Sequence, residues 1–340
     1  MALQLELHEV ELPLEHPFTI ARGTVTMQRS LIAELREEGQ SGYGEAPATE
    51  YYGASVENVR EALEGVRGLV EAKTLVTSDP EALLPEWRAA LAEHPFALCA
   101  LDGAACDLWG KLRGEPVHRL WGLDPADAPK SSYTIGIDSI RVMIDKLKER
   151  PDWPIYKIKL GTPRDIEIVE ALRGHTDSAF RVDANCGWTA DETVTHAPRL
   201  AELGVEFIEQ PLVPGDEGQE RVFAECALPV IADENCVAEF DVEACVGRFH
   251  GVNIKLCKCG GPSIARRMAL RARELGLKVM VGCMTETSVG ISAAAQVGPL
   301  TDYLDLDGAV LLAEDAATGV RVEQGNIVFP DLPGSGIDLL

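Results

Sequence analysis

From about residue 131 onward, the chain alternates between short apolar runs and longer amphipathic stretches. The short runs are rich in β-branched and aromatic residues, as expected of strands. They cover residues 131–138, 155–161, 179–185, 205–211, 228–234, 251–256, 277–284 and 303–308. The stretches between them read as helices. In residues 189–204, for example, Thr189 stands where it can cap a helix and Gly204 where it can end one.

Eight such strand–helix units predict an α/β fold with a parallel sheet that closes into a (β/α)8-type barrel. A doubly wound open sheet is the alternative. That fold calls for a glycine-rich nucleotide-binding turn after its first strand, and the sequence has none there. We therefore expect the barrel to occupy residues 126–320.

The first part of the chain has a different pattern. Residues 3–14 and 29–46 read as antiparallel strands, and residues 57–72 and 100–114 as helices. This order predicts a separate N-terminal α+β domain over residues 1–125. Residues 321–340 lie beyond the eighth barrel strand, and we expect this C-terminal segment to pack back toward the N-terminal domain.

The composition is that of an ordinary globular protein, with 46% hydrophobic and 25% charged residues in a chain of 340. Acidic residues outnumber basic ones by 55 to 31, a formal net charge of −24. Such a surface repels phosphate backbones and anionic lipids, so we expect neither nucleic acid nor membrane partners. With no signal-peptide pattern and no long apolar run, a cytoplasmic location is expected, and the sequence leaves a homo-oligomer open.

Charged residues recur where the predicted barrel strands end. They are Lys159, Asp183, Glu209, Asp233 and Lys255, spaced 22 to 26 residues apart, or about one strand–helix unit each. Because strand ends meet at one mouth of a barrel, the three acids should surround one point. A hard divalent cation such as Mg2+ would relieve their mutual repulsion. The alternative is that each acid merely caps the helix that follows it.

Lysines flank this acid series on both sides. Lys157 and Lys159 are two residues apart on one strand and so point the same way, whereas Lys255 comes from the far side of the acids. A bound cation and a neighbouring ammonium would lower the pKa of such a lysine toward the range of a general base. The alternative is that each lysine extends to solvent. We expect Lys258, three residues further on, at the surface or on the substrate approach.

Several motifs together resemble the enolase superfamily, in its muconate-lactonizing subgroup. They are KIKLG at 157–161, RVDANCGW at 181–188, FIEQP at 207–211, IADEN at 231–235, NIKLCKCGG at 253–261 and LDGAACDLWGKLRGEPVHRLWG at 101–122. The resemblance implies an enolase-like barrel under an N-terminal capping domain. It also implies Mg2+ held by Asp183, Glu209 and Asp233. Lys159 and Lys255 would then be the acid/base residues, and Lys157 would stabilise the enolate.

The last predicted strand narrows the resemblance to the dipeptide epimerases. Asp305 and Asp307 lie on one side of that strand and need a positive partner. In the dipeptide epimerases a DxD motif holds the α-ammonium of the substrate. Helix capping is the alternative for these two acids. The same likeness implies Thr134, Met284 and Glu286 as substrate-binding residues.

The segment HPFTIARGTV at 16–25 is expected to form a lid, because Gly23 permits a mobile turn. In L-Ala-D/L-Glu epimerases an arginine at this place reaches the glutamate side chain, which implies that role for Arg22. Solvation of an isolated surface arginine is the alternative. Tyr51 and Tyr52 are expected to shape the same pocket.

Together these features predict an isomerase: a Mg2+-dependent epimerase of dipeptides. It would invert the α-carbon of the C-terminal residue by two-lysine 1,1-proton transfer through an enolate, with L-Ala-D/L-Glu as the leading substrate. Turnover of cell-wall peptides is the setting that the resemblance implies. Four alternatives remain open: an epimerase of hydrophobic or cationic dipeptides, an o-succinylbenzoate synthase or N-acylamino acid racemase, a Schiff-base lyase, and a non-catalytic binding protein.

Overall fold

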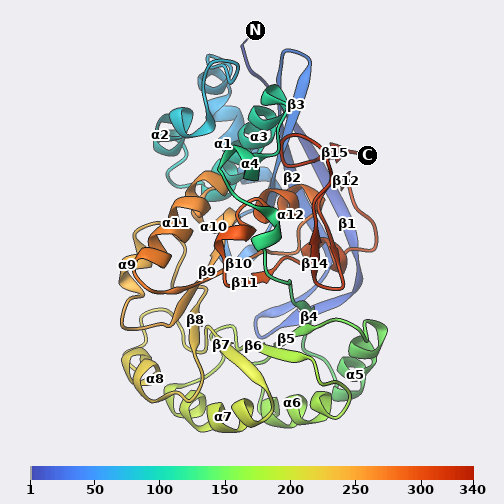
Figure 1. Cartoon of the computed structure of the whole chain (residues 1–340), viewed down its shortest axis with the longest axis vertical. Coiled ribbons are helices and arrows are strands. Elements are labelled where there is room, and N and C mark those ends of the chain that lie inside the picture. The colour runs from blue at the N-terminus through green and yellow to red at the C-terminus, as the bar shows by residue number, and fades with distance from the viewer. Residues whose placement is uncertain (1) are drawn as a thin grey trace.

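The computed structural model describes residues 2–340 and has an antiparallel N-terminal domain beside a parallel barrel (Figure 1). The N-terminal sheet has the order β1–β2–β3, with strands Gln4–Ile20, Gly23–Glu37 and Gln40–Pro47. The helices that follow are α1 (Val56–Val70), α2 (Pro80–Ala90), α3 (Pro95–Arg113) and α4 (Val117–Leu120). The predicted antiparallel strands and both predicted helices are present. The helix at Pro80–Ala90 had not been anticipated.

The eight predicted barrel strands are all present and are parallel neighbours in chain order. They are β4 (Tyr133–Ile135), β5 (Ile155–Lys159), β6 (Ala179–Asp183), β7 (Val205–Glu209), β8 (Val230–Ala232), β9 (Gly251–Lys255), β10 (Lys278–Gly282) and β11 (Tyr303–Asp305). A parallel bridge between Ser131 and Leu304 closes the ring between its first and last strands. The (β/α)8-type barrel is therefore confirmed.

Helices cover the outside of the barrel. They are α5 (Ile140–Glu149), α6 (Asp165–Arg173), α7 (Ala190–Glu202), α8 (Gln219–Glu225), α9 (Asp241–Ala244), α10 (Leu256–Cys259), α11 (Pro262–Glu274) and α12 (Ser288–Ala295). Thr189 caps α7 in a capping box with Glu192, and Gly204 follows that helix at a φ of 76°. After β11 the chain makes only a 3-10 turn, Gly308–Leu311, so the eighth unit has no α-helix of its own within residues 2–340.

The C-terminal segment forms small strands and contacts α3. These strands are β12 (Ala317–Thr318), β13 (Arg321–Glu323), β14 (Asn326–Val328) and β15 (Asp338–Leu339). Ser335 donates its backbone N–H to Asp107 at 2.7 Å, and Lys111 donates to the backbone oxygen of Ile337 at 2.7 Å. These contacts join the chain end to the N-terminal domain, while the boundaries at residues 125 and 320 stay predictions.

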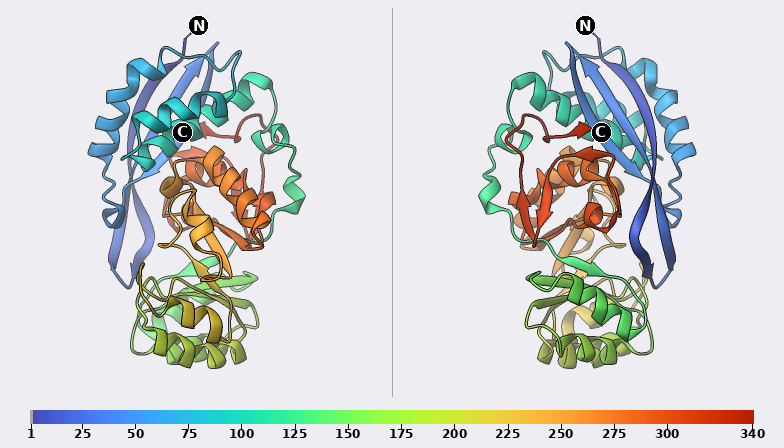
Figure 2. Two further views of the ribbon diagram at one scale, coloured as in Figure 1. Left: turned by 90° about the vertical axis from the view of Figure 1, so that its left-hand side faces the viewer. Right: turned by 90° about the vertical axis from the view of Figure 1, so that its right-hand side faces the viewer.

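The hairpin of β1 and β2 extends past the rest of its domain and lies alongside the barrel (Figure 2). Near its tip, Ile137 donates its backbone N–H to the oxygen of Thr19 at 2.7 Å. A Cβ on Gly136 would lie 3.0 Å from that same oxygen, and a Cβ on Gly161 would lie 3.0 Å from the Cβ of Ala21. The absence of side chains at these two glycines therefore lets the hairpin tip approach the barrel mouth closely.

Candidate active site

The three acids predicted to hold a metal come together at the barrel mouth. Asp183 ends β6, Glu209 ends β7 and Asp233 directly follows β8, three neighbouring strands. Each residue is at most 1% exposed, and one carboxylate oxygen from each lies within 4.8 Å of the others. Three buried anions so close together repel strongly unless positive charge balances them.

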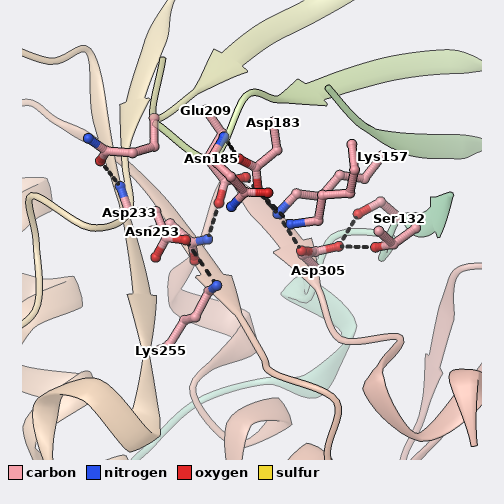
Figure 3. Close-up of polar contacts among 12 residues, drawn as sticks. Ser132, Lys157, Asp183, Asn185, Glu209, Asp233, Asn253, Lys255 and Asp305 are labelled. Atoms are coloured by element: carbon pink, nitrogen blue, oxygen red, sulfur yellow. Dashed lines mark hydrogen bonds and ion pairs between the residues drawn. The ribbon is translucent and has the colours of Figure 1, made fainter. Parts of the chain in front are cut away.

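Lysines supply positive charge around the acids (Figure 3). Lys157 Nζ lies 2.7 Å from Glu209 Oε2 and 3.2 Å from Asp183 Oδ2, and Lys159 Nζ donates to Asp183 Oδ2 at 2.7 Å. Lys255 reaches the acids from a different side and donates to Asp233 Oδ2 at 3.0 Å. The sequence-predicted lysines and acids therefore form one continuous charged cluster.

The acids and lysines shift one another's pKa values. Burial alone would raise the pKa of Asp233, but the ammonium groups of Lys255 and Lys258 outweigh burial and hold it well below the usual range. Burial and the charge of Asp183 raise the pKa of Glu209 to about 7. Burial would lower the pKa of Lys255, yet the Asp233 carboxylate outweighs it and raises that pKa. Asp233 thus holds Lys255 as an ammonium at neutral pH.

Residues behind the acids hold them in place. Asn253 on β9 is fully buried and donates its side-chain N–H to Glu209 Oε1 at 2.7 Å. Gln210 accepts the backbone N–H of Asp233 at 2.9 Å. Lys258 was expected at the surface, and that expectation is wrong. It is 4% exposed and donates to Asp233 Oδ1 at 2.5 Å, because the turn of α10 directs it back under the end of β8.

The charged cluster opens into a cavity of about 790 Å3 between the barrel mouth and the N-terminal domain. Among its lining residues are most of those predicted from the sequence: Arg22, Tyr51, Tyr52, Thr134, Lys157, Lys159, Asp233, Lys255, Met284, Asp305 and Asp307. The remaining two acids, Asp183 and Glu209, lie beneath this surface and are fully buried.

Asp305 and Asp307 occupy the side of the cavity formed by β4 and β11. Ser132 donates its hydroxyl to Asp305 at 2.6 Å, and Lys157 Nζ lies 2.8 Å from the same carboxylate. Burial raises the pKa of Asp305, but Lys157 outweighs burial and lowers it to about 2. Thr134 donates its backbone N–H to Asp307 at 2.6 Å. Burial and the negative charge of Asp305 raise the pKa of Asp307 to about 7.

Arg22, at the tip of the hairpin, crosses the cavity to the barrel. It donates to Glu234 Oε1 at 2.7 Å and to the backbone oxygen of Asn185 at 3.2 Å. Its guanidinium carbon lies 4.0 Å from the centre of the Tyr51 ring, close enough for a cation–π contact. Glu234 was not singled out from the sequence. Its pairing with Arg22 joins residues 212 positions apart, a separation that sequence spacing cannot reveal.

The loop after β10 contributes Met284 to the cavity lining, whereas Glu286 lies outside that lining. Glu286 is 5% exposed and accepts the backbone N–H of Met284 at 2.7 Å. Burial, with the nearby carboxyl of Glu45, raises the pKa of Glu286 to about 8. Glu286 thus fixes the loop that carries Met284, just before α12 begins at Ser288 and packs beside β3. Its contact with a substrate stays a prediction.

The donor set of the cluster suits Mg2+. All three groups are carboxylates, and hard oxygen donors are what this ion prefers. A bound cation would relieve the mutual repulsion of the three carboxylates. Asp183, Glu209 and Asp233 are the residues that would hold it.

Comparisons with known proteins agree with this site. Residues 2–122 match the mandelate racemase/muconate lactonizing enzyme N-terminal domain, and residues 142–340 match the "Enolase C-terminal domain-like" family. The chain is 50% identical to an L-Ala-D/L-amino acid epimerase of a Maribacter strain, over 99% of both chains. It is 48% identical to a protein of the same name from Flavobacterium johnsoniae, over 99% of this chain and 100% of that one.

A solved structure with the same fold also has a related sequence. It is a dipeptide epimerase from Enterococcus faecalis V583, complexed with Mg and the dipeptide L-Leu-L-Tyr. The identity is 31%, the TM-score is 0.92, and 99% of each chain is covered. No helix among residues 2–340 is long and apolar enough to cross a membrane. The chain belongs to the mandelate racemase/muconate lactonizing enzyme family of the enolase superfamily.

Proposed function

We propose that the protein is a Mg2+-dependent dipeptide epimerase that inverts the α-carbon of the C-terminal residue. One observation carries the proposal: a single cavity contains two lysines from opposite sides of a buried acid cluster and a second acid pair, Asp305 and Asp307, next to that cluster. Inversion needs one group that removes a proton on one face and another that returns a proton on the other. A bound metal ion and the ammonium group of a substrate each need acidic partners, so the site requires two separate sets of acids.

The chain's own residues have distinct tasks in this reaction. Lys159 and Lys255 exchange the α-proton, each on its own face of the substrate. Lys157 is held by Glu209 and Asp305, so its ammonium is preorganised beside the position where negative charge develops. Mg2+, when bound, would neutralise the charge that builds up on the substrate carboxylate. A cation would also compete with Lys255 for the Asp233 carboxylate and weaken the interaction that raises the pKa of this lysine.

Asp305 and Asp307 favour a free dipeptide over an acylated amino acid. Asp305 already pairs with Lys157, whereas Asp307 is 2% exposed, lines the cavity and accepts from the neutral N–H and hydroxyl of Thr134. An ionised Asp307 is therefore costly to bury without a cationic partner. The α-ammonium of a dipeptide supplies that partner. The substrates of an o-succinylbenzoate synthase or N-acylamino acid racemase have no ammonium for this wall of the cavity.

We infer L-Ala-D/L-Glu as a substrate, within a wider range of C-terminal residues. Arg22 can donate to a glutamate side chain through guanidinium N–H groups other than those directed at Glu234. Because Glu234 already balances the charge of Arg22, an uncharged side chain does not leave this arginine buried and unpaired. The wider range also agrees with the names of the two similar relatives.

A screen of dipeptides in D2O with Mg2+ tests the function. Incorporation of one deuterium at the α-carbon, followed by mass, reports proton removal even where net inversion is hidden by equilibrium. We expect exchange with L-Ala-L-Glu and with other L-Ala dipeptides. Exchange with succinylated amino acids but with no free-amine dipeptide would overturn the proposal.

Variants of the two lysines test the mechanism. Lys159→Ala and Lys255→Ala should each abolish inversion, because each removes the proton carrier of one face. Each variant should still exchange the α-proton of one substrate epimer, and the two variants should differ in which epimer that is. Inversion retained by both variants would refute the two-lysine mechanism.

A further inference from the structure

Lys258 makes contacts that an ordinary surface lysine does not make. Its Nζ lies 2.5 Å from Asp233 Oδ1, 2.6 Å from the backbone oxygen of Asp233 and 3.2 Å from the backbone oxygen of Asn253. An ammonium has three N–H donors, so all of them have an acceptor. The side chain is only 1% exposed. All three donors of the Lys258 ammonium are therefore used in contacts inside the protein.

Two of these contacts go to the same residue. Binding the backbone oxygen and one carboxylate oxygen of Asp233 together restricts rotation of that side chain about its first torsion. The third contact, to Asn253, links the end of β8 to β9. Asn253 in turn donates to Glu209 at 2.7 Å. Lys258 thus holds Asp233 directly and is linked through Asn253 to Glu209, so two of the three acids belong to one hydrogen-bond network.

The contacts of Asp233 divide between two lysines with different positions. Oδ1 accepts from Lys258, which does not line the cavity, while Oδ2 accepts from Lys255, which does. Lys258 therefore has no route to a substrate, and any effect on the reaction must pass through Asp233. Because Lys258 already satisfies Oδ1, Lys255 does not have to neutralise this carboxylate alone.

We propose that Lys258 is a positioning residue that orients Asp233 as a metal ligand and so sets the affinity of the site for Mg2+. This inference rests on the proposed metal site. Groups that orient a metal ligand change metal affinity by about 10- to 100-fold when removed. Removing Lys258 also removes a positive charge that repels a cation, and this effect alone would tighten binding. We expect loss of orientation to dominate, since the substitution leaves the buried Oδ1 of Asp233 without its donor, while the backbone oxygen keeps only the N–H of Cys236.

Lys111 offers a matched control. It too is a nearly buried lysine that pairs with a buried acid, Asp107 at 2.8 Å, and donates to two backbone oxygens, those of Ser41 and Ile337. It belongs to α3, far from the acid cluster in sequence and outside the cavity lining. Replacing either lysine by methionine removes the same charge and the same number of donors.

The experiment measures Mg2+ binding by titration calorimetry in the full-length protein, alongside thermal unfolding. Lys258→Met should bind Mg2+ about 10- to 100-fold more weakly, whereas Lys111→Met should lose stability but keep the wild-type dissociation constant. In α-deuterium exchange, Lys258→Met should need more Mg2+ for half-maximal rate, and most of the rate should return at saturating Mg2+. Lys258→Arg keeps the charge and several donors and should lie between the wild type and Lys258→Met.

Three outcomes would overturn the inference: unchanged or tighter Mg2+ binding by Lys258→Met, an equal change in Lys111→Met, or loss of rate that saturating Mg2+ does not restore. If Lys258→Met does not fold, Lys258→Gln and Lys258→Arg are compared with Lys111→Gln and Lys111→Arg by the same criteria. Failure of the wild-type protein itself to bind Mg2+ would instead overturn the proposed function, so the two failures are distinguishable.

Discussion

At the residue scale, Asp307 is expected to make kcat/KM depend on pH. Its pKa is raised to about 7 by burial and by the charge of Asp305, so the free protein ionises it only as the pH rises through neutrality. A substrate ammonium needs the ionised form. At saturating Mg2+, we expect kcat/KM for L-Ala-L-Glu to fall below pH 7 by up to about tenfold per pH unit, since this ratio reports groups of the free enzyme.

The matched variant for that pH profile is Asp307→Asn. It should lower kcat/KM at pH 8 and largely remove the fall between pH 7 and pH 6. A wild-type profile that stays level over this interval would contradict the assignment, as would an unchanged fall in the variant.

A second residue-scale prediction concerns Arg22. Arg22→Met should lower kcat/KM for L-Ala-L-Glu by about tenfold or more, because a charge-assisted hydrogen bond contributes about 1.5–3 kcal/mol. Exchange with L-Ala-L-Leu should change much less. Equal losses of kcat/KM for the two dipeptides would mean that Arg22 supports the lid and does not bind the side chain of the C-terminal substrate residue. Glu234→Gln tests the pairing, since it frees Arg22 and should favour the glutamate dipeptide.

The position that sequence reasoning misjudged, Lys258, is decided by tertiary contacts. The strand-end acids could be predicted because a barrel brings the ends of its strands to one place. Lys258 could not, since a lysine in a short polar turn normally reaches solvent. The buried neighbours Cys257 and Cys259 were the available signal that this turn lies inside the protein.

At the scale of elements, the barrel strands could be predicted from the sequence because both their faces are buried. Strands of that kind appear as continuous apolar runs, and β8 and residues 279–281 of β10 are examples. The length of β1 was harder to predict, since its register with β2 shifts between Pro13 and Phe18. A shift of that kind breaks the alternation of apolar and polar residues on which the strand prediction depended.

The packing of β3 on α3 yields an element-scale prediction. A Cβ on Gly44 would lie 2.1 Å from the backbone oxygen of Ala100, which is too short for two non-bonded atoms. Gly44→Ala should therefore lower the free energy of unfolding by about 1–3 kcal/mol or more, measured by urea denaturation. Gly65, exposed in the middle of α1, has no atom within 4 Å of a built Cβ, and Gly65→Ala should raise stability by about 0.5–1 kcal/mol. Similar stability changes in the two variants would refute this account of the packing.

At the scale of the whole molecule, the N-terminal domain completes two helices of the barrel. Asp102 on α3 accepts the backbone N–H of Ser263 at 2.8 Å, in the first turn of α11. Glu45 on β3 accepts the backbone N–H groups of Thr287 and Gly290 at 3.0 Å, at the start of α12. Unpaired N–H groups at a helix start need such acceptors, and here they come from the other domain.

Apolar packing joins the same two parts. Leu98 of α3 belongs to one buried apolar cluster with Leu256 and Ile264 of the barrel side. A Cβ on Gly260 would lie 2.8 Å from the Leu98 side chain. The N-terminal domain and the β8–β11 side of the barrel thus share one core. Separation of the domains would expose apolar surface and unpaired donors together, so neither part is expected to unfold alone.

Scanning calorimetry of the wild-type protein should therefore give one unfolding transition, with van 't Hoff and calorimetric enthalpies close to each other. Glu45→Ala leaves three buried donors at the start of α12 without this acceptor, namely the N–H groups of Thr287 and Gly290 and the Thr287 hydroxyl, at a cost of about 1–3 kcal/mol or more. It should lower the midpoint and still give a single transition, because the shared core remains. Glu61→Ala, at an exposed position of α1, is the control and should leave the midpoint nearly unchanged. Two resolved transitions in the wild type, or a Glu45→Ala midpoint equal to that of the control, would mean that the N-terminal domain folds independently of the barrel it covers.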